Sequence, residues 1–129
     1  NSEVFLSGSS KVSNNLAQDY GGGIYLVYGS SLKVSKGTTF DDNEAGEYGA
    51  AVYTIYDSSA DIDGAEFVNN RVGWYEWDGE GGMDGAAICS WSDSDVKVSR
   101  SEFKSNTARR NGGAVFQGKL YTESPPVGA

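Results

Sequence analysis

Two short sequence blocks recur along the chain, and their spacing constrains the fold more than any other feature. The first block is a glycine, two small residues and an aliphatic residue. Its four copies are Gly21-Gly22-Gly23-Ile24, Gly49-Ala50-Ala51-Val52, Gly85-Ala86-Ala87-Ile88 and Gly112-Gly113-Ala114-Val115. The copies start at positions 21, 49, 85 and 112, which are 28, 36 and 27 residues apart. Four repeats of such a unit are typical of a solenoid, in which successive units stack on one another.

The second block places an asparagine three residues after an apolar residue, and it interleaves with the first. Its copies are Val12-Ser13-Asn14-Asn15, Phe40-Asp41-Asp42-Asn43, Phe67-Val68-Asn69-Asn70 and Phe103-Lys104-Ser105-Asn106. The closing asparagine precedes the next glycine block by 6, 6, 15 and 6 residues, so the one long period comes from extra residues after Asn70. We therefore expect a β-helix domain over residues 1–121 with an insertion at about 73–84, and a linker-like tail over residues 122–129.

Between the two blocks, apolar residues fall at every second position, which is the period of a half-buried strand. The four runs are Val4-Phe5-Leu6-Ser7, Leu32-Lys33-Val34-Ser35, Ala60-Asp61-Ile62-Asp63 and Val96-Lys97-Val98-Ser99. Each unit of ~27 residues thus offers three short strands: this run, one after the glycine block and one that ends in the asparagine block. The pattern predicts an all-β protein, a parallel β-helix of about four coils with three short strands per coil, about 19 Å tall.

The repeated residues suit particular places in such a coil. We expect Phe40, Phe67 and Phe103 to stack inside the helix, with Val12 in the equivalent place of the first coil. Asparagine tolerates a left-handed backbone at a turn, and its side-chain amide can bond the coils on either side. The predicted asparagine ladder consists of Asn15, Asn43, Asn70 and Asn106. The small residues of the glycine block allow a tight backbone bend.

The orientation of the strand after the glycine block stays open at this point. Either its aliphatic residues, such as Ile24 and Val52, face inward, or the alternate set does. The first choice sends Tyr25, Tyr53 and Trp91 outward, and such an exposed aromatic face is a candidate surface for binding a partner or a glycan. The second choice buries these three side chains.

The insertion is the one segment that the repeat does not require, and loops on a rigid scaffold often carry function. It contains Trp74, Tyr75 and Trp77, which could contact a partner or stack on a sugar ring. It also contains four carboxylates, which make calcium an alternative ligand although the spacing does not match an EF-hand. These are Glu76, Asp78, Glu80 and Asp84. A third interpretation is a flap whose aromatic side chains cover part of the sheet.

Composition excludes several classes of function. The chain has no histidine, which removes His-ligated metals and catalytic triads that use histidine. Its net charge of −8 opposes attraction to nucleic acid, and it has no apolar run long enough to span a bilayer. The single cysteine, Cys89, cannot form an intrachain disulfide, and we interpret it as a small buried apolar residue. We predict no cofactor, with Ca²⁺ as the one exception described above.

The paired blocks resemble the repeats of chlamydial polymorphic membrane proteins and of related bacterial β-helix passenger and adhesin domains. The best match is Gly112-Gly113-Ala114-Val115 together with Phe103-Lys104-Ser105-Asn106, and the resemblance extends to about Phe116. It implies a right-handed parallel β-helix, an exported protein and a role in adhesion or surface display. The chain departs from that pattern in two copies that lack the second glycine, and in Val12, which replaces the phenylalanine.

These observations favour a non-catalytic, extracellular or cell-surface β-helix module. We expect it to act in adhesion, or as a structural segment or subunit of a surface protein or fibre. Its partners would be neighbouring coils, a second copy, or a cell-surface protein or glycan. The alternative is a glycan-binding module or a fragment of a polysaccharide lyase or hydrolase. The enzyme would use the acidic insertion together with Asp57 and Asp93, which follow their glycine blocks by eight residues and so should lie on adjacent coils.

Overall fold

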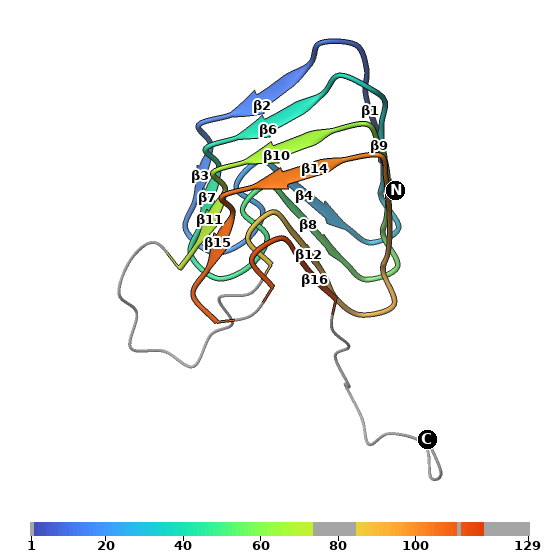
Figure 1. The fold of residues 1–129 in the computed structure, drawn as a ribbon. Helices are drawn as coiled ribbons and strands as arrows, with labels where there is room; N and C mark the ends of the chain where they lie inside the picture. The colour runs from blue at the N-terminus through green and yellow to red at the C-terminus, as the bar shows by residue number, and fades with distance from the viewer. Residues whose placement is uncertain (1, 74–84, 111, 118–129) are drawn as a thin grey trace, which may run out of the picture.

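A computed structural model describes residues 2–73, 85–110 and 112–117 of the chain. The described residues contain sixteen strands in four parallel sheets and no helix. Each sheet takes one strand from each of four coils, and each strand pairs with the strand four places later in the chain. The strands therefore stack as successive turns of one coil path (Figure 1). This confirms the predicted parallel β-helix of about four coils.

Three sheets form the longer sides of the coil. The first sheet in chain order consists of β1 (Glu3–Leu6), β5 (Ser31–Val34), β9 (Ser59–Asp63) and β13 (Asp95–Ser99). Another consists of β2 (Lys11–Ser13), β6 (Thr39–Asp41), β10 (Glu66–Val68) and β14 (Glu102–Lys104). The fourth sheet in chain order is also long, and it consists of β4 (Ile24–Val27), β8 (Val52–Ile55), β12 (Ile88–Ser90) and β16 (Val115–Gln117). These three sheets correspond to the three strands predicted for each coil.

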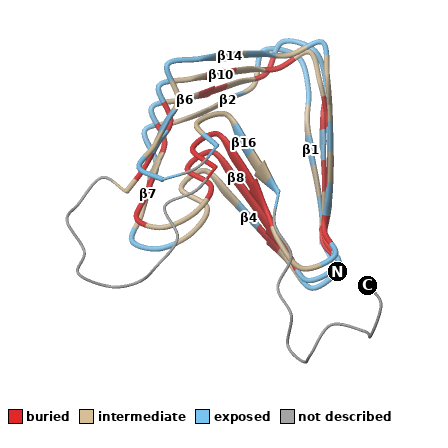
Figure 2. Ribbon diagram, turned by 60° about the horizontal axis from the view of Figure 1, so that its bottom comes forward, coloured by how far each residue is buried: buried red, intermediate tan, exposed pale blue. Residues whose placement is uncertain are grey.

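A shorter sheet, the third in chain order, makes the coil four-stranded rather than three-stranded. It consists of β3 (Leu16–Ala17), β7 (Glu44–Ala45), β11 (Arg71–Val72) and β15 (Thr107–Ala108). Figure 2 shows the three longer sheets around a roughly triangular outline, with this short sheet at one corner. A two-residue strand is too short to leave an alternating pattern in the sequence, and so the sequence pattern does not predict it.

The register brings equivalent residues of the repeat into line. Phe40 pairs with Val12 on one side and with Phe67 on the other, and Phe67 pairs with Phe103. The ring centroids of Phe40 and Phe67 lie 4.6 Å apart and those of Phe67 and Phe103 4.8 Å apart, with nearly parallel planes. Phe40 and Phe67 are fully buried. The phenylalanine stack thus fills the interior at the spacing of neighbouring strands.

The asparagine ladder is formed by side-chain hydrogen bonds that all run in one direction. Asn15, Asn43 and Asn70 each donate from Nδ2 to the Oδ1 atom of the asparagine one coil later, at 2.9, 2.9 and 2.8 Å. The backbone N–H of each donor residue bonds to the same Oδ1 atom. Every buried amide in the middle of the ladder is therefore paired, as burial of polar groups requires.

The left-handed backbone at this turn lies one residue earlier than predicted. Asn14, Asp42, Asn69 and Ser105 have φ between 54° and 58°. The ladder asparagine that follows each of them is not among the residues with positive φ. The expectation that the ladder residue itself occupies the left-handed conformation is therefore wrong. The ladder needs asparagine for its amide, whereas the preceding position needs a short polar residue that tolerates positive φ.

The glycine block turns the chain from the short sheet into the fourth sheet. Its first residue has positive φ in every coil, between 57° and 65° at Gly21, Gly49, Gly85 and Gly112. A Cβ atom on Gly49 would lie 2.5 Å from the carbonyl oxygen of Val52, which is closer than van der Waals contact allows. In the two inner coils the next two small residues are fully buried, namely Ala50 and Ala51 in one and Ala86 and Ala87 in the other.

The structure settles the orientation that the sequence left open. Ile24, Val52 and Ile88 face inward and pack in the main core with Phe40 and Phe67. The alternate residues of the same strands face outward, yet they differ in exposure. Tyr25 is 47% exposed, whereas Tyr53 is 3% exposed and Cys89 fully buried. These outward residues form a separate hydrophobic cluster on the outer face of the fourth sheet.

Candidate binding surface

Aromatic side chains gather on the outer face of the fourth sheet around a pocket of about 280 Å³. We call this site the tyrosine pocket. Its lining residues are Tyr20, Tyr25, Tyr48, Tyr53, Ile55, Tyr56 and Trp91. Strands β4 and β8 position Tyr25, Tyr53 and Ile55, because outward positions recur at every second residue of a strand. The turns after β8 and β12 supply Tyr56 and Trp91.

Tyr20 and Tyr48 reach the pocket from the turns that precede β4 and β8. Each stands one residue before a glycine block, and the two residues pair with each other across neighbouring coils. The Tyr20 ring stacks on Tyr53 at 5.1 Å and on Tyr48 at 5.7 Å between centroids. These two rings therefore cover Tyr53, which explains why an outward-facing residue is buried.

The rings differ in how they meet one another. Tyr20, Tyr48 and Tyr53 are nearly parallel, with interplanar angles of 16° to 23°. Tyr25 meets Tyr20 and Tyr53 edge to face, and Trp91 meets Tyr48 in the same way at 5.6 Å. Both arrangements are favourable for aromatic rings. The cluster is thus a packed aromatic platform rather than a set of isolated side chains.

Burial raises the pKa of three phenol groups in the pocket. Burial raises the pKa of Tyr20 to about 12, and the adjacent Glu47 carboxylate, which accepts a hydrogen bond from its hydroxyl, adds to the rise. Burial also raises the pKa of Tyr25, and it raises the pKa of Tyr53 well above its ordinary value. The charged phenolate is disfavoured because it would lose its hydration. The pocket therefore offers neutral hydroxyl groups beside aromatic rings.

One polar atom of the pocket residues lacks a partner. The indole nitrogen of Trp91 is buried, and no hydrogen-bond acceptor in the described part of the chain contacts it. The pocket is open to solvent at two of its other residues, because Tyr25 is 47% and Tyr56 40% exposed. Tyr28 extends this exposed aromatic surface by stacking on Tyr56 at 5.3 Å. The site thus combines exposed ring faces with a buried, unused donor.

Three of the predicted binding residues come together here, namely Tyr25, Tyr53 and Trp91. Tyr53 is packed beneath the other rings, whereas Tyr25 and Trp91 retain exposed surface. The sequence analysis missed Tyr20, Tyr48 and Tyr56. A signal for the first two was present, since a tyrosine directly before the glycine block recurs in two consecutive repeats.

The predicted residues of the insertion lie outside the described residues. They are the aromatic candidates Trp74, Tyr75 and Trp77 and the acidic candidates Glu76, Asp78, Glu80 and Asp84. Over the described ranges, no group of three carboxylate or cysteine side chains could hold a metal ion. Calcium binding by the insertion stays a prediction.

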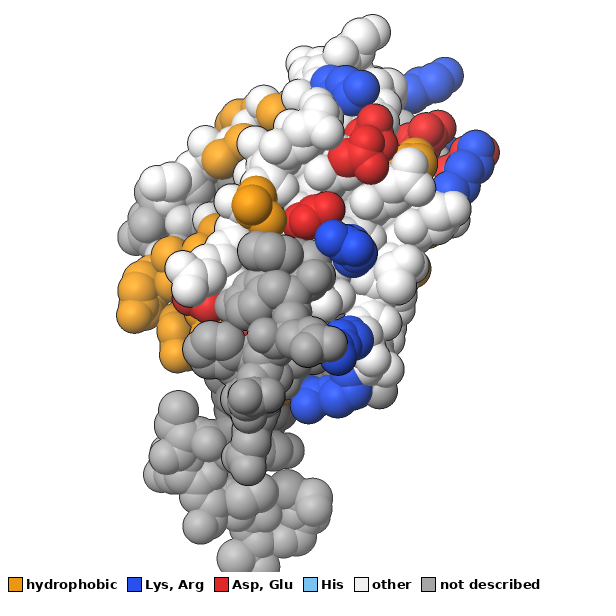
Figure 3. Space-filling view, turned by 90° about the vertical axis from the view of Figure 1, so that its left-hand side faces the viewer, with side chains coloured by type: hydrophobic (Ala, Val, Ile, Leu, Met, Phe, Trp, Pro, Cys, Tyr) orange, Lys and Arg blue, Asp and Glu red, His pale blue; other side chains and the backbone are white. Residues whose placement is uncertain are grey.

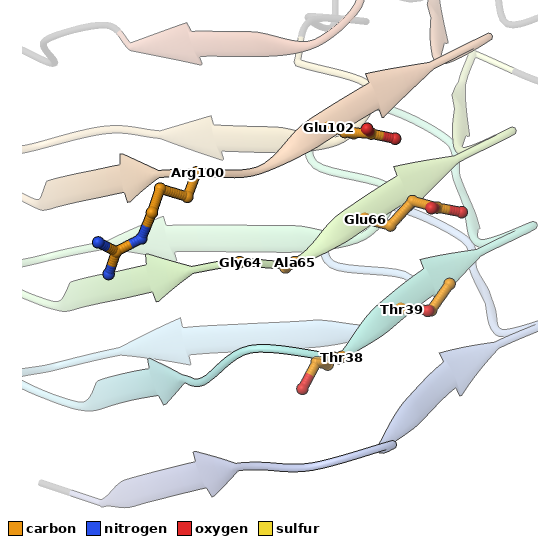
Figure 4. A pocket seen from close by; sticks show the side chains of 8 residues that line it. Thr38, Thr39, Gly64, Ala65, Glu66, Arg100 and Glu102 are labelled. Carbon is orange, nitrogen blue, oxygen red and sulfur yellow. The ribbon is translucent and has the colours of Figure 1, made fainter.

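A second pocket, of about 320 Å³, lies beside the turn that leads into β10 and β14. In Figure 4, Glu66 and Glu102 extend in one direction from consecutive strands, and Arg100 extends in the opposite direction. Glu102 pairs with Lys104 at 3.2 Å, and Arg100 binds the Asp63 carboxylate. Since these charged groups do not converge on a common point, the pocket is a weaker candidate than the tyrosine pocket.

The first sheet carries charged side chains that already balance one another. Lys33, Asp61 and Lys97 occupy the same register position in consecutive coils, and so opposite charges alternate at strand spacing. Arg100 donates to Asp63 from Nε at 2.8 Å, and this contact lowers the pKa of Asp63. In the space-filling view, hydrophobic side chains gather along one edge and charged side chains toward the other (Figure 3). The charged ladder and the aromatic platform lie on different sheets, the first and the fourth.

The two carboxylates of the enzymatic alternative lie on adjacent coils. The backbone N–H of Asp57 donates to the carbonyl oxygen of Ser92 at 3.3 Å, one residue before Asp93. Both aspartates have a left-handed backbone, with φ of 61° and 58°, and both side chains are exposed. This is the environment of polar turn residues in water, which lacks the burial that tunes a catalytic acid.

No family model, no curated protein and no solved structure matches this chain. Among the residues that the structure describes, no helix is long and apolar enough to cross a membrane.

Proposed function

We propose that this chain is a non-catalytic, extracellular β-helix module that acts in adhesion, with the tyrosine pocket and its exposed rim as the contact surface. The observation that carries the proposal is the aromatic platform on the outer face of the fourth sheet. Exposed tyrosine and tryptophan side chains supply contact area at a low cost in conformational entropy, and they are enriched at binding sites. The parallel coils hold these rings on a rigid scaffold.

The sequence supports the same function in two further ways. The glycine and asparagine blocks resemble those of bacterial surface-displayed β-helices, whose role is adhesion. The chain also contains no histidine, which removes the commonest acid–base catalyst. A scaffold with paired charges on one sheet and an aromatic platform on another suits a binding role.

Adhesion can be tested with beads that carry the purified chain and are washed over cultured epithelial cells. We expect the Y25A/Y56A double variant to lose most bead retention, because both side chains are exposed parts of the platform. The matched control is F5A, which removes an aromatic ring that is 68% exposed but lies on β1, in a different sheet. Equal retention of the parent chain and the double variant would contradict the proposed function.

A structural role is the second candidate, and the direction of the asparagine ladder favours it. Each asparagine donates to the coil that follows, so a coil added next to β1–β4 would donate to the Oδ1 atom of Asn15. A coil added next to β13–β16 would accept from Asn106. The added coil could belong to the same protein or to a second copy stacked head to tail. Light scattering over a wide concentration range distinguishes these sources, since a constant monomer mass would exclude the second copy.

A further inference from the structure

The tyrosine pocket has chemical features that contact area alone does not explain. The buried indole nitrogen of Trp91 contacts no acceptor in the described residues, and leaving a buried donor unpaired is unfavourable. Trp91 lines a pocket whose rim, at Tyr25 and Tyr56, is open to solvent. A ligand that brings an acceptor to this nitrogen would satisfy the unused donor.

The arrangement of the rings selects a flat ligand over a small cation. An aromatic cage for a quaternary ammonium group needs ring faces that surround a common centre. Here Tyr20, Tyr48 and Tyr53 are nearly parallel, and their faces are largely covered by one another. The exposed surface comes from Tyr25 and Tyr56 at the rim. A ligand therefore lies across this platform instead of being enclosed by it.

The polar groups of the pocket select a ligand that both donates and accepts hydrogen bonds. The hydroxyl groups of Tyr20, Tyr25 and Tyr53 are uncharged at neutral pH, since the ordinary pKa of a tyrosine is 10.0 and burial raises it further. Glu47 supplies a carboxylate acceptor next to Tyr20. The chain carries a net charge of −8, which opposes the approach of an anionic ligand. The ligand class is thus uncharged, with an apolar face and several hydroxyl groups.

We propose that the tyrosine pocket binds an uncharged pyranose unit of a glycan, which lies across Tyr25 and Tyr56 with an oxygen directed at the indole N–H of Trp91. The C–H face of a pyranose ring packs on aromatic rings, and its hydroxyl groups bond to the phenols and to Glu47. The pocket volume of about 280 Å³ is near the lower end of small-molecule sites, in keeping with one sugar unit rather than a long oligosaccharide. This inference rests on the proposed function, since it names the ligand of the same surface.

The experiment is a calorimetric or NMR titration of the full chain with neutral methyl pyranosides of glucose, galactose, mannose and N-acetylglucosamine. We expect at least one of them to bind with a millimolar Kd. Y25A and Y56A should each weaken that binding about tenfold or more, because each removes a stacking ring. W91F keeps an aromatic ring but lacks the N–H group, and it should also weaken binding about tenfold, the effect expected when a single hydrogen bond is lost.

Two controls keep the result specific to this pocket. F5A should leave the Kd unchanged, since Phe5 lies on another sheet. The methyl glycoside of glucuronic acid should bind more weakly than that of glucose, because its carboxylate approaches an acidic chain. Far-ultraviolet circular dichroism of each variant shows whether it keeps the fold, and the high exposure of Tyr25 and Tyr56 makes their replacement well tolerated.

Three outcomes would overturn the inference. The first is that no neutral pyranoside binds. The second is that binding is unaffected by Y25A, Y56A and W91F, which would place the sugar elsewhere on the chain. The third is that tetramethylammonium binds and pyranosides do not, which would make the site a cation site. If the double variant still abolishes bead adhesion while no sugar binds, adhesion stands and only the ligand is wrong. If adhesion and sugar binding are both absent, both proposals fail.

Discussion

At the scale of single residues, Asn70 shows how the interior accommodates polar groups. It is fully buried, and its Oδ1 atom accepts from the backbone N–H and the Nδ2 of Asn43. Its own Nδ2 donates to the carbonyl oxygen of Phe40 at 3.1 Å and to Oδ1 of Asn106 at 2.8 Å. One amide thus connects three coils. A buried polar network of this kind stabilises the fold only while every member is paired.

Asn70→Ala should therefore be strongly destabilising. It removes the acceptor of the buried Asn43 backbone N–H and one donor each from the Phe40 carbonyl oxygen and Asn106 Oδ1, and a buried group left unpaired costs about 1–3 kcal/mol. We expect a loss of about 3 kcal/mol or more in the free energy of unfolding, measured by urea denaturation. Asn15→Ala is the control, because Asn15 is exposed and belongs to the first coil, and it should cost about 1 kcal/mol. Similar losses for the two variants would contradict this account of the ladder.

Tyr20 predicts how stability depends on alkaline pH. Its pKa is about 12 in the folded protein, above the ordinary value of 10.0. A raised pKa means that the folded state keeps a proton that the unfolded state loses, so this stabilisation is complete below pH 10 and is lost as the pH rises to about 12. Urea denaturation between pH 9 and 12 should show falling stability, and Tyr20→Phe should reduce the slope. An unchanged slope in that variant would exclude Tyr20 as the source.

At the scale of secondary-structure elements, the turns determine the shape of each coil. The strands are only two to five residues long, and so each turn must place its strand in register with the coil before it. A left-handed residue stands before each ladder asparagine and at the start of each glycine block. Because these conformations recur at equivalent positions, four dissimilar repeats follow the same path. The turns thus carry much of the information that specifies the fold.

Gly49→Ala tests whether the glycine that begins a glycine block is required for stability. A methyl group there would lie 2.5 Å from the carbonyl oxygen of Val52 and 2.9 Å from Cβ of Tyr53, in a residue whose φ is 57°. The left-handed backbone alone costs about 1–2 kcal/mol, and the clash adds to it. Gly8→Ala is the matched control, because Gly8 has a φ of 63° but no atom within 4 Å of the added methyl. Thermal unfolding should show a clearly lower Tm for Gly49→Ala, and equal shifts would mean that the clash contributes nothing.

At the scale of the whole molecule, the four coils share one continuous interior. The phenylalanine stack, the asparagine ladder and the aliphatic core all pass through successive coils. In such a solenoid each coil contacts only its neighbours, so that inner coils are held from two sides and outer coils from one. Strand β12 belongs to the third coil and pairs with both β8 and β16.

Cys89, in the middle of β12, reports on the opening of this inner coil. Its thiol is fully buried beneath the aromatic cluster. We expect a thiol reagent such as Ellman's reagent to modify the native chain very slowly and the unfolded chain at once. The dependence of labelling on urea should give the same free energy as the global transition seen by circular dichroism. Rapid labelling in the absence of urea would show that the third coil opens independently.

Much of the architecture was predictable because it depends on short-range pattern. The spacing of the repeats predicted the number of coils. The alternation of apolar residues around Leu32 and Ile62 predicted a strand with one buried face. The short strand β3 was missed, since two residues cannot show a period. The left-handed position was misplaced by one residue, because both Asn14 and Asn15 suit a turn and only the hydrogen bonds distinguish their roles.

The candidate site depended on contacts that no local pattern contains. In the strands that contain Tyr25 and Tyr53, both sets of alternating residues include apolar side chains. The sequence by itself therefore could not decide which set faces inward. The tertiary structure decided it, because Val52 and Ile88 complete the core beside Phe40 and Phe67. It also brought Tyr20 and Tyr48 over Tyr53 from turns that lie outside the strands. The sequence determined the coil, whose period repeats along the chain, and the tertiary structure determined the pocket, whose walls come from different coils.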